Sequence, residues 1–179
     1  MKVIDTKLQD VKIIEMDVFG DHRGFFTESY SKAKFAEHGL DFDFVQDNHS
    51  LSQKGVLRGL HYQLNPFAQG KLVRVVQGRA WDVAVDIRKD SETYGQWVGV
   101  ELSAENYKQF WIPEGFAHGF IALEDNTQFL YKATNYYNKA SERAIIWNDE
   151  NLAIDWQVDG LLEILVSEKD QEANRFSNL

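Results

Sequence analysis

The sequence predicts an all-β protein, built as a sandwich or barrel of antiparallel sheets. Apolar residues recur at every second position through most of the chain, as they do in half-buried strands. Turn residues separate these runs at short and fairly even spacing. The runs do not alternate with long amphipathic segments, so the rhythm of a parallel βαβ fold is missing.

The period-two pattern locates the individual strands. We expect the first strands at residues 11–19 and 72–76. Residues 80–87 alternate most strictly, because apolar side chains occupy one face while Asp82 and Asp86 occupy the other. Further strands are expected at residues 97–102, 109–112, 119–123, 128–134 and 144–147.

Two short helices are expected beside these strands. Residues 31–38 have Ser31 as a candidate N-cap and are followed by Gly39, which suits a helix end. Residues 167–173 are polar, with Ser167 as a candidate N-cap, and predict a surface helix.

Length and composition limit the class of protein. The 179 residues are 44% hydrophobic and 26% charged, which fits one globular domain spanning residues 1–179. The chain has no apolar run long enough to span a membrane, no signal-peptide pattern at its start and no cysteine, so we expect a cytoplasmic protein. Its net charge of −9 argues against nucleic acid as a partner but allows a small anionic ligand in a local basic pocket.

Two segments concentrate residues that can carry chemistry. Residues 55–63 contain Arg58 and His61, which a strict pleat places on opposite faces unless the neighbouring glycines permit a bulge. Residues 111–120 place His118 after a tight turn and beside a glycine. Taken singly, each histidine is more often a hydrogen-bonded core residue than a catalytic group.

The sequence offers little support for metal, nucleotide-cofactor or acyl-transfer chemistry. Metal-binding jelly rolls commonly carry two histidines one residue apart, whereas Tyr62 and Gln63 follow His61 here. The motifs G-x-S-x-G, G-x-x-x-x-G-K-[ST] and G-x-G-x-x-G are all missing. We therefore expect no metal ion, and acyl transfer, phosphoryl transfer and dinucleotide redox chemistry lose support.

Taken together, the motifs resemble one family. Their combination and order are similar to those of the dTDP-4-dehydrorhamnose 3,5-epimerases of the cupin superfamily, from about Phe19 to Asp170. The segments that carry the resemblance are residues 55–63, 69–75, 82–88, 93–97, 111–120 and 146–149. The resemblance implies a cupin-type jelly-roll barrel with a few short peripheral helices. It also implies a dTDP-sugar substrate, no cofactor, and a homodimer with shared active sites.

The resemblance also implies a role for individual residues. His61 matches the general base, Asp170 the carboxylate that orients it, Tyr131 the acid on the opposite face of the sugar, and Lys71 a residue near the keto oxygen. Tyr137 matches the aromatic side chain that stacks on the base, although a proline that usually follows this tyrosine pair is missing, which leaves Tyr136 as an alternative. The remaining substrate contacts implied are Arg23, Glu28, Gln46, Asp47, Asn48, Arg58, His118, Glu142 and Lys169.

These roles suit the chemistry of a carbon next to a ketone. Removing its proton needs a base that works near neutrality, which histidine supplies, and a positive group where the enolate oxygen forms. Inversion then needs a proton donor on the other face. The expected activity is epimerisation of dTDP-4-dehydro-6-deoxy-D-glucose at C3 and C5 to dTDP-4-dehydro-L-rhamnose. The alternatives are a single-centre epimerase or ketoisomerase of another dTDP-deoxysugar pathway, and a non-catalytic sugar-binding cupin.

Overall fold

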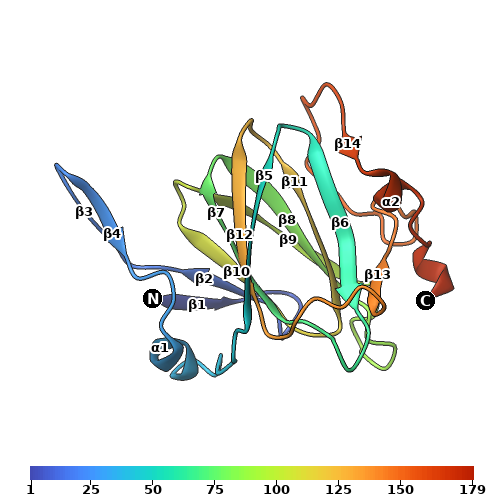
Figure 1. Cartoon of the computed structure of the whole chain (residues 1–179), viewed down its shortest axis with the longest axis horizontal. Coiled ribbons are helices and arrows are strands. Elements are labelled where there is room, and N and C mark those ends of the chain that lie inside the picture. The colour runs from blue at the N-terminus through green and yellow to red at the C-terminus, as the bar shows by residue number, and fades with distance from the viewer.

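The computed structural model, which describes residues 1–179, is a two-layer arrangement of antiparallel sheets (Figure 1). The first sheet has the order β1-β2-β10-β7-β12-β5 and the second the order β13-β6-β11-β8-β9. The strands of the first sheet are β1 (Lys2–Asp5), β2 (Lys12–Glu15), β10 (Lys108–Ile112), β7 (Lys71–Gln77), β12 (Thr127–Ala133) and β5 (Gln46–Ser52). Those of the second are β13 (Glu142–Ala144), β6 (Val56–Gln63), β11 (Phe116–Ala122), β8 (Arg79–Asp86) and β9 (Trp97–Ser103). The predicted all-β, jelly-roll class is confirmed.

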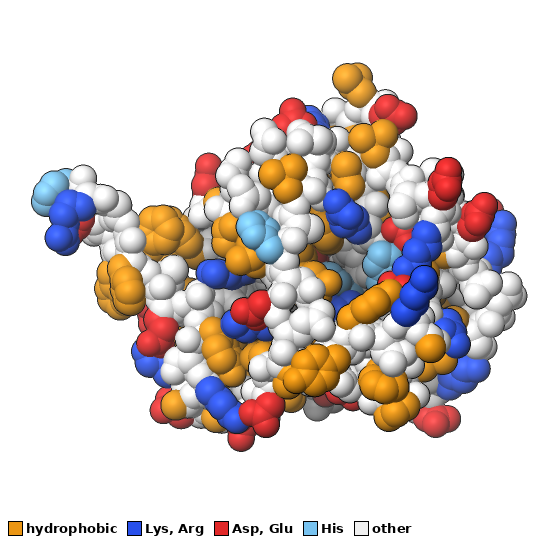
Figure 2. Space-filling view, in the orientation of Figure 1, with side chains coloured by type: hydrophobic (Ala, Val, Ile, Leu, Met, Phe, Trp, Pro, Cys, Tyr) orange, Lys and Arg blue, Asp and Glu red, His pale blue; other side chains and the backbone are white.

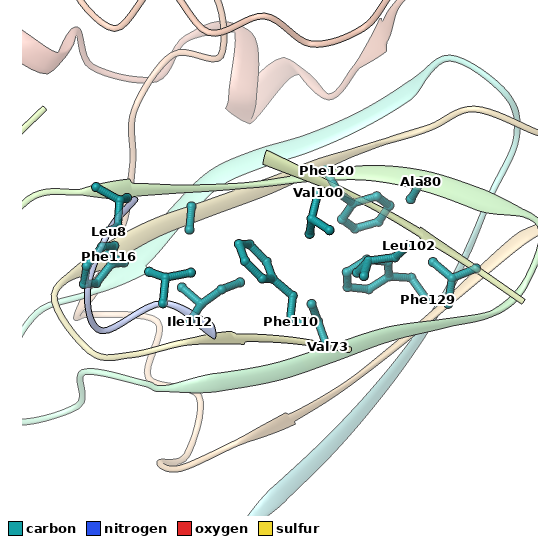
Figure 3. Close-up of a cluster of buried hydrophobic side chains, with 13 residues drawn as sticks. Leu8, Val73, Ala80, Val100, Leu102, Phe110, Ile112, Phe116, Phe120 and Phe129 are labelled. Carbon is teal, nitrogen blue, oxygen red and sulfur yellow. The ribbon is translucent and has the colours of Figure 1, made fainter. Parts of the chain in front are cut away.

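The main core fills the space between the two sheets. Phe110 and Phe129 come from the first sheet and Phe120 and Leu102 from the second, and they meet in one cluster (Figure 3). The rings of Phe120 and Phe129 stack across the gap with centroids 4.0 Å apart. This packing fixes how far apart the two sheets lie.

The outer face of the second sheet is covered, and that of the first sheet is covered in part. The segment after β13 lies over the second sheet, where Leu152 and Trp156 pack against Val83 and Val85 of β8. Phe35, in the short helix α1 (Lys32–Ala36), packs with Trp111 against the first sheet. Because both of its faces are covered, the second sheet can hold side chains away from water on either side.

The strand β8 shows the consequence most clearly. Its alternation was predicted correctly, but the aspartate face points into the molecule, beside Ala80 and Ala84 of the main core. Asp82 and Asp86 are both fully buried. A buried carboxylate needs partners, and the two aspartates have different ones.

One predicted strand is wrong in extent. Residues 11–19 form β2 and then leave the sheet, and β3 (Val18–Asp21) pairs with β4 (Gly24–Thr27) as a separate hairpin arm. The arm projects away from both sheets (Figure 1). Ile14 is buried whereas Phe19 is 66% exposed, so the run of apolar residues spans two environments that period two alone does not separate.

Smaller corrections concern the helices and the last predicted strand. The helix expected at residues 31–38 is shorter in the structure, where α1 spans Lys32–Ala36, and the Ser31 side chain makes no cap hydrogen bond. The helix expected at residues 167–173 is α2 (Glu168–Gln171), and Ser167 caps it as predicted. Of the strand expected at residues 144–147, only Ala144 belongs to β13; Ile145 still exchanges backbone hydrogen bonds with Leu60 of β6, and the chain then leaves the sheet.

The remaining elements are short. A parallel pair joins β14 (Leu165–Val166) to β6, and a 3-10 helix spans Phe176–Asn178. No helix in the structure is long and apolar enough to span a bilayer.

The ion pair at the end of β8 generates a stability prediction. Asp86 accepts hydrogen bonds from Arg88, Ser91 and Thr93, which lower the pKa of this carboxyl despite the opposing effect of burial. Asp86→Asn should reduce the free energy of unfolding by about 2 kcal/mol at neutral pH, since it removes charge-assisted bonds to a buried group.

The pH dependence tests the same assignment. A depressed pKa in the folded state contributes stability that is present above the unfolded pKa of about 4 and is lost as pH falls below it. Urea denaturation at fixed protein concentration should therefore show the difference between Asp86→Asn and the parent shrinking below about pH 4. An unchanged difference at pH 3 would contradict the role of the ionised carboxylate.

Candidate active site

A cavity of about 350 Å³ opens between the two sheets, and all four predicted catalytic residues line it. In Figure 2 it is the hollow in which blue and pale-blue side chains gather. Its walls combine cationic and titratable groups with aromatic rings of the main core. The lining residues are Ser50, Val56, Leu57, Arg58, His61, Lys71, His118, Phe120, Phe129, Tyr131, Leu165, Ser167, Lys169 and Asp170.

A bulge in β6 brings Arg58 and His61 to the same side. His61 lies opposite His118 of β11, and Arg58 lies opposite Phe120, so β6 advances three residues while β11 advances two. Gly59 lies in this irregular stretch with φ of +124°, and a Cβ there would come within 2.5 Å of the Gly119 backbone. The sequence allowed a bulge at this point without requiring one. The structure contains it, and the bulge places Arg58 and His61 on the same side, where a regular strand would separate them.

His61 and Asp170 form a hydrogen-bonded pair in the cavity wall. The His61 Nε2 atom lies 2.6 Å from Asp170 Oδ1, while the other carboxylate oxygen accepts the Gly59 backbone N–H at 3.3 Å. Burial acts to raise the pKa of Asp170, but the bonds from His61, Gly59 and Ser167 outweigh it and keep that pKa below its usual range. The carboxylate is therefore ionised at neutral pH, and it fixes the ring and tautomer of His61.

Tyr131 and Lys71 approach the cavity from the opposite sheet. Ala133 of β12 lies opposite Lys71 of β7, and Tyr131 is two residues from Ala133, so Tyr131 and Lys71 share the inward face. Burial, and secondarily the negative charge of Glu142, raise the pKa of Tyr131, which keeps its hydroxyl protonated. Burial lowers the pKa of Lys71 to about 8.

His118 lines the same cavity from β11 and is almost fully buried. Its Nε2 atom lies 3.0 and 2.9 Å from the two carboxylate oxygens of Asp82. Two histidines on the adjacent strands β6 and β11 thus line the cavity, and each is bonded to an aspartate. The His61 side chain is 31% exposed, whereas that of His118 is 8% exposed, so only His61 has substantial access to a ligand.

A polar rim borders the cavity near α2. Lys169 forms an ion pair of 2.6 Å with Glu142, and the Tyr137 hydroxyl donates to the same carboxylate at 3.0 Å. The side-chain oxygen of Gln46 accepts the Tyr137 backbone N–H, and its amide nitrogen donates to Asn48. The Nδ2 atom of Asn48 is buried without a hydrogen-bond partner.

Three predicted contact residues are not brought to the cavity within one chain. Arg23 lies at the tip of the hairpin arm, bonded to Asp21. Glu28 follows the arm and pairs with Lys34 at 2.9 Å. Asp47 lies on the outward face of β5, where it pairs with Lys132 at 3.0 Å. Asp47 alternates with Gln46 and Asn48, which explains why these neighbours in sequence face different sides.

Other residues of the site were not predicted from the sequence. Asp82 was assigned to a strand face but to no part of the site, although a carboxylate within an apolar strand was a usable signal. The strand β5 was not predicted either, and its inward residues include Ser50 of the cavity wall. No group of three or more His, Cys, Asp or Glu side chains converges in a way that could hold a metal ion.

The arrangement can act on a proton next to a carbonyl group. A histidine–carboxylate pair lies on one wall and a protonated tyrosine on the facing wall, and each wall also carries a cationic side chain, Arg58 beside His61 and Lys71 beside Tyr131. These are the groups that an isomerase needs to remove a proton from one face of a carbon and return one to the other.

Comparison with known proteins agrees with this class. The sequence profile described as dTDP-4-dehydrorhamnose 3,5-epimerase matches residues 5–178. The Shigella flexneri protein of that name is 58% identical over 98% of this chain and 96% of its own length. The Salmonella typhimurium protein is 59% identical over 97% of this chain and 94% of its own length. The chain belongs to the dTDP-4-dehydrorhamnose 3,5-epimerase family, as its motifs predicted.

Solved structures give the same result. The Legionella pneumophila dTDP-6-deoxy-D-glucose-3,5-epimerase in complex with dTDP-4-keto-L-rhamnose has a TM-score of 0.94 and 51% identity, covering 98% of this chain and 93% of that one. A 3′-monoepimerase from Streptomyces bikiniensis in complex with dTDP-quinovose has a TM-score of 0.91 but only 30% identity, covering 97% and 87%. The fold is therefore shared by single-centre and double epimerases.

Proposed function

We propose that this protein epimerises dTDP-4-dehydro-6-deoxy-D-glucose at C3 and C5 to give dTDP-4-dehydro-L-rhamnose. The observation that carries the proposal is the placement of His61 and Tyr131 on facing sheets of one cavity. Packed sheets are separated by about 10 Å, which leaves room for a sugar ring with one of these groups on each side. High identity to double epimerases favours two centres over one.

In this mechanism His61 is the general base. Its ring takes the proton from the carbon beside the keto group, and Asp170 stabilises the imidazolium that forms. The electron pair left on carbon moves onto the keto oxygen, giving an enolate. The adjacent ammonium of Lys71 stabilises the developing negative charge.

Tyr131 returns a proton from the opposite face. Because its pKa is raised by burial, the hydroxyl holds its proton at neutral pH and gives it up only to a strong base such as the enolate carbon. The enolate collapses to the ketone with the carbon inverted. His61 then releases its proton to solvent and Tyr131 takes one up from solvent, which restores the base and the acid. A second cycle at the other carbon next to the same ketone gives the double epimer.

The rim residues are proposed to hold the nucleotide. Of the tyrosine pair, Tyr137 is favoured as the stacking platform because its hydroxyl is anchored to Glu142, which in turn pairs with Lys169 of the cavity wall. The Tyr136 side chain has no hydrogen-bond partner in the structure and is 62% exposed. Arg58, which is bonded to Ser52 at 3.1 Å, is suited to a diphosphate oxygen.

We also propose a homodimer in which the hairpin arm completes the neighbour's site. Phe19, Phe25 and Phe26 of the arm are each more than half exposed, and rings so exposed need a covering surface. The arm carries Arg23 away from its own cavity, so an anion-binding role for Arg23 requires a second chain (Figure 1).

The first functional prediction concerns the base. His61→Ala should abolish turnover while leaving dTDP affinity nearly unchanged, since the imidazole acts on the sugar. Asp170→Asn should be damaging but less complete, because the imidazole remains. Steady-state kinetics and calorimetric titration with dTDP check both. A loss smaller than about tenfold for His61→Ala would contradict a role usually worth about 10²–10⁴ in rate.

The second concerns the acid. Tyr131→Phe removes the hydroxyl and keeps the ring, so proton abstraction by His61 should continue while inversion is largely lost. NMR of sugar recovered from deuterated buffer should show deuterium incorporated with little inverted product. A variant that inverts both centres at the parental rate would show that another group is the acid. In the parent protein the same experiment separates the candidate functions, since a double epimerase labels two carbons, a single-centre epimerase one, and a binding protein none.

The third tests site sharing. When Arg23→Ala and His61→Ala chains exchange subunits, a mixed dimer should contain one site in which both residues are intact. At equal mixing, activity should reach about a quarter of the parental value, since half of the dimers are mixed. The controls are the two variants incubated separately. Failure to recover activity after demonstrated subunit exchange would contradict the shared site.

A further inference from the structure

Asp82 is a fully buried carboxylate that the proposed mechanism does not use. It lies on the inward face of β8, and the strand residues on either side are apolar. Burying an ionised carboxylate costs several kcal/mol unless partners compensate. Its only hydrogen-bonding partner is His118, through both carboxylate oxygens.

A second buried carboxylate on the same face provides a comparison. Asp86 is held by the guanidinium of Arg88 and by two hydroxyl groups, an arrangement that explains its presence by structure alone. Asp82 has no lysine or arginine within ion-pair distance, and its histidine partner lines the cavity. The one side chain bonded to Asp82 therefore belongs to the candidate active site.

The contact fixes the state of His118. Burial raises the pKa of Asp82, whereas the charge of His118, the hydrogen bond from its ring and the charge of Lys71 lower it. When Asp82 is ionised, its carboxylate only accepts hydrogen bonds, so a neutral His118 ring carries its proton on Nε2 and leaves Nδ1 as an unprotonated acceptor. Burial lowers the pKa of His118, and the positive charges of Lys71 and His61 act in the same direction, against the attraction of Asp82. These effects together favour the neutral form of the His118 ring.

The negative charge of Asp82 also acts on the ammonium group of Lys71. Burial lowers the pKa of the ammonium to about 8, and the negative charges of Asp82 and Glu142 oppose that change. The titratable and charged groups around this part of the cavity are Arg58, His61, Asp82, His118, Tyr131, Glu142, Lys169 and Asp170. Among the groups that favour the ammonium, Asp82 has the largest effect.

We propose that Asp82 is a positioning residue for the epimerisation, whose carboxylate holds His118 as a neutral Nε2–H tautomer and keeps Lys71 positively charged. The three groups then form a buried set with no net charge, one anion, one cation and one neutral ring. Asp82 touches neither substrate nor reacting carbon; it acts through the two cavity residues. The activity part of this inference rests on the proposed function, whereas the ionisation states do not.

The ionisation states are tested in the unaltered protein without substrate. With ¹⁵N-labelled histidine, His118, assigned by comparison with His118→Asn, should remain a neutral Nε2–H tautomer from pH 6 to 9. With ¹³C-labelled lysine, Lys71, assigned by comparison with Lys71→Arg, should titrate near pH 8. An Nδ1–H tautomer, a protonated His118 ring, or a Lys71 titration above pH 10 would overturn the proposal.

The charge is tested with Asp82→Asn, which keeps the size of the side chain and one acceptor oxygen. Removing a nearby negative charge disfavours the ammonium, so the Lys71 titration should move to lower pH by about one unit. The alkaline limb of kcat/KM should move with it, and kcat at pH 7 should fall about tenfold or more. In the Lys71→Arg variant the alkaline limb of kcat/KM should be missing, whether or not Asp82→Asn is also present.

Asp86→Asn is the matched control, a buried carboxylate on the same face of the same strand. It should lower stability while leaving the Lys71 titration and the alkaline limb in place. If Asp82→Asn lowers the melting temperature but changes neither the Lys71 titration nor the alkaline limb of kcat/KM, Asp82 has only a structural role and the proposal fails. If the Lys71 titration moves as expected but the protein does not convert the dTDP-sugar, the proposed function fails and the placement of Asp82 stands. Should Asp82→Asn not fold, the tautomer and Lys71 titration of the unaltered protein decide.

Discussion

The hydrogen bond between His61 and Asp170 joins the two parts of the chain on which the site depends. His61 comes from the middle of β6, and Asp170 from α2, more than a hundred residues later. The other oxygen of the same carboxylate accepts the Gly59 N–H, so it also holds the bulge that turns His61 toward the cavity. Ser167 caps α2 by accepting the Asp170 backbone N–H, which places the carboxyl at the start of the helix. The C-terminal segment is therefore both the cover of the second sheet and the support of the base.

The space between the sheets divides into an apolar part and a polar part. Toward one side, phenylalanine and aliphatic side chains close the gap completely. Toward the other, lysine, tyrosine and histidine replace them, and the cavity remains open. Phe120 and Phe129 belong to both parts, since they stack in the core and line the cavity. The apolar packing thus sets the separation at which the polar groups of opposite sheets face each other, and a core substitution that changes this separation would misplace the base relative to the acid.

The sequence was sufficient for the regular parts of this molecule and insufficient for the irregular ones. The strict alternation of β8 identified a strand, but not that both of its faces are buried, because that depends on a segment seventy residues away that covers the outer one. The strand β5 was missed because its residues are polar, inward ones facing the cavity and outward ones facing solvent. The glycines of residues 55–63 allow a bulge in β6 but do not require it, because the bulge is determined by the pairing of β6 with β11. His61, Tyr131, Lys71, Arg58, His118 and Asp170 were placed in one site by family resemblance, and they do line one cavity. Arg23 lies at the tip of the β3–β4 hairpin arm, away from the cavity of its own chain, and the period-two pattern of residues 11–19 does not predict this arm.

The negative charge of the whole protein contrasts with the positive charge gathered in its cavity. The chain carries a net charge of −9, yet its cavity gathers Arg58, Lys71 and Lys169. Lys71 has a pKa of about 8, so a measurable fraction is unprotonated at neutral pH. A nearby negative charge stabilises the ammonium form of Lys71. Because this linkage is reciprocal, the ammonium stabilises the negative charge by the same free energy. In the proposed reaction the enolate is the species with the most negative charge beside Lys71, so the interaction is stronger with the intermediate than with the ketone. A lysine held near its titration point by burial and by Asp82 therefore favours the high-energy species over the substrate, which is what catalysis requires.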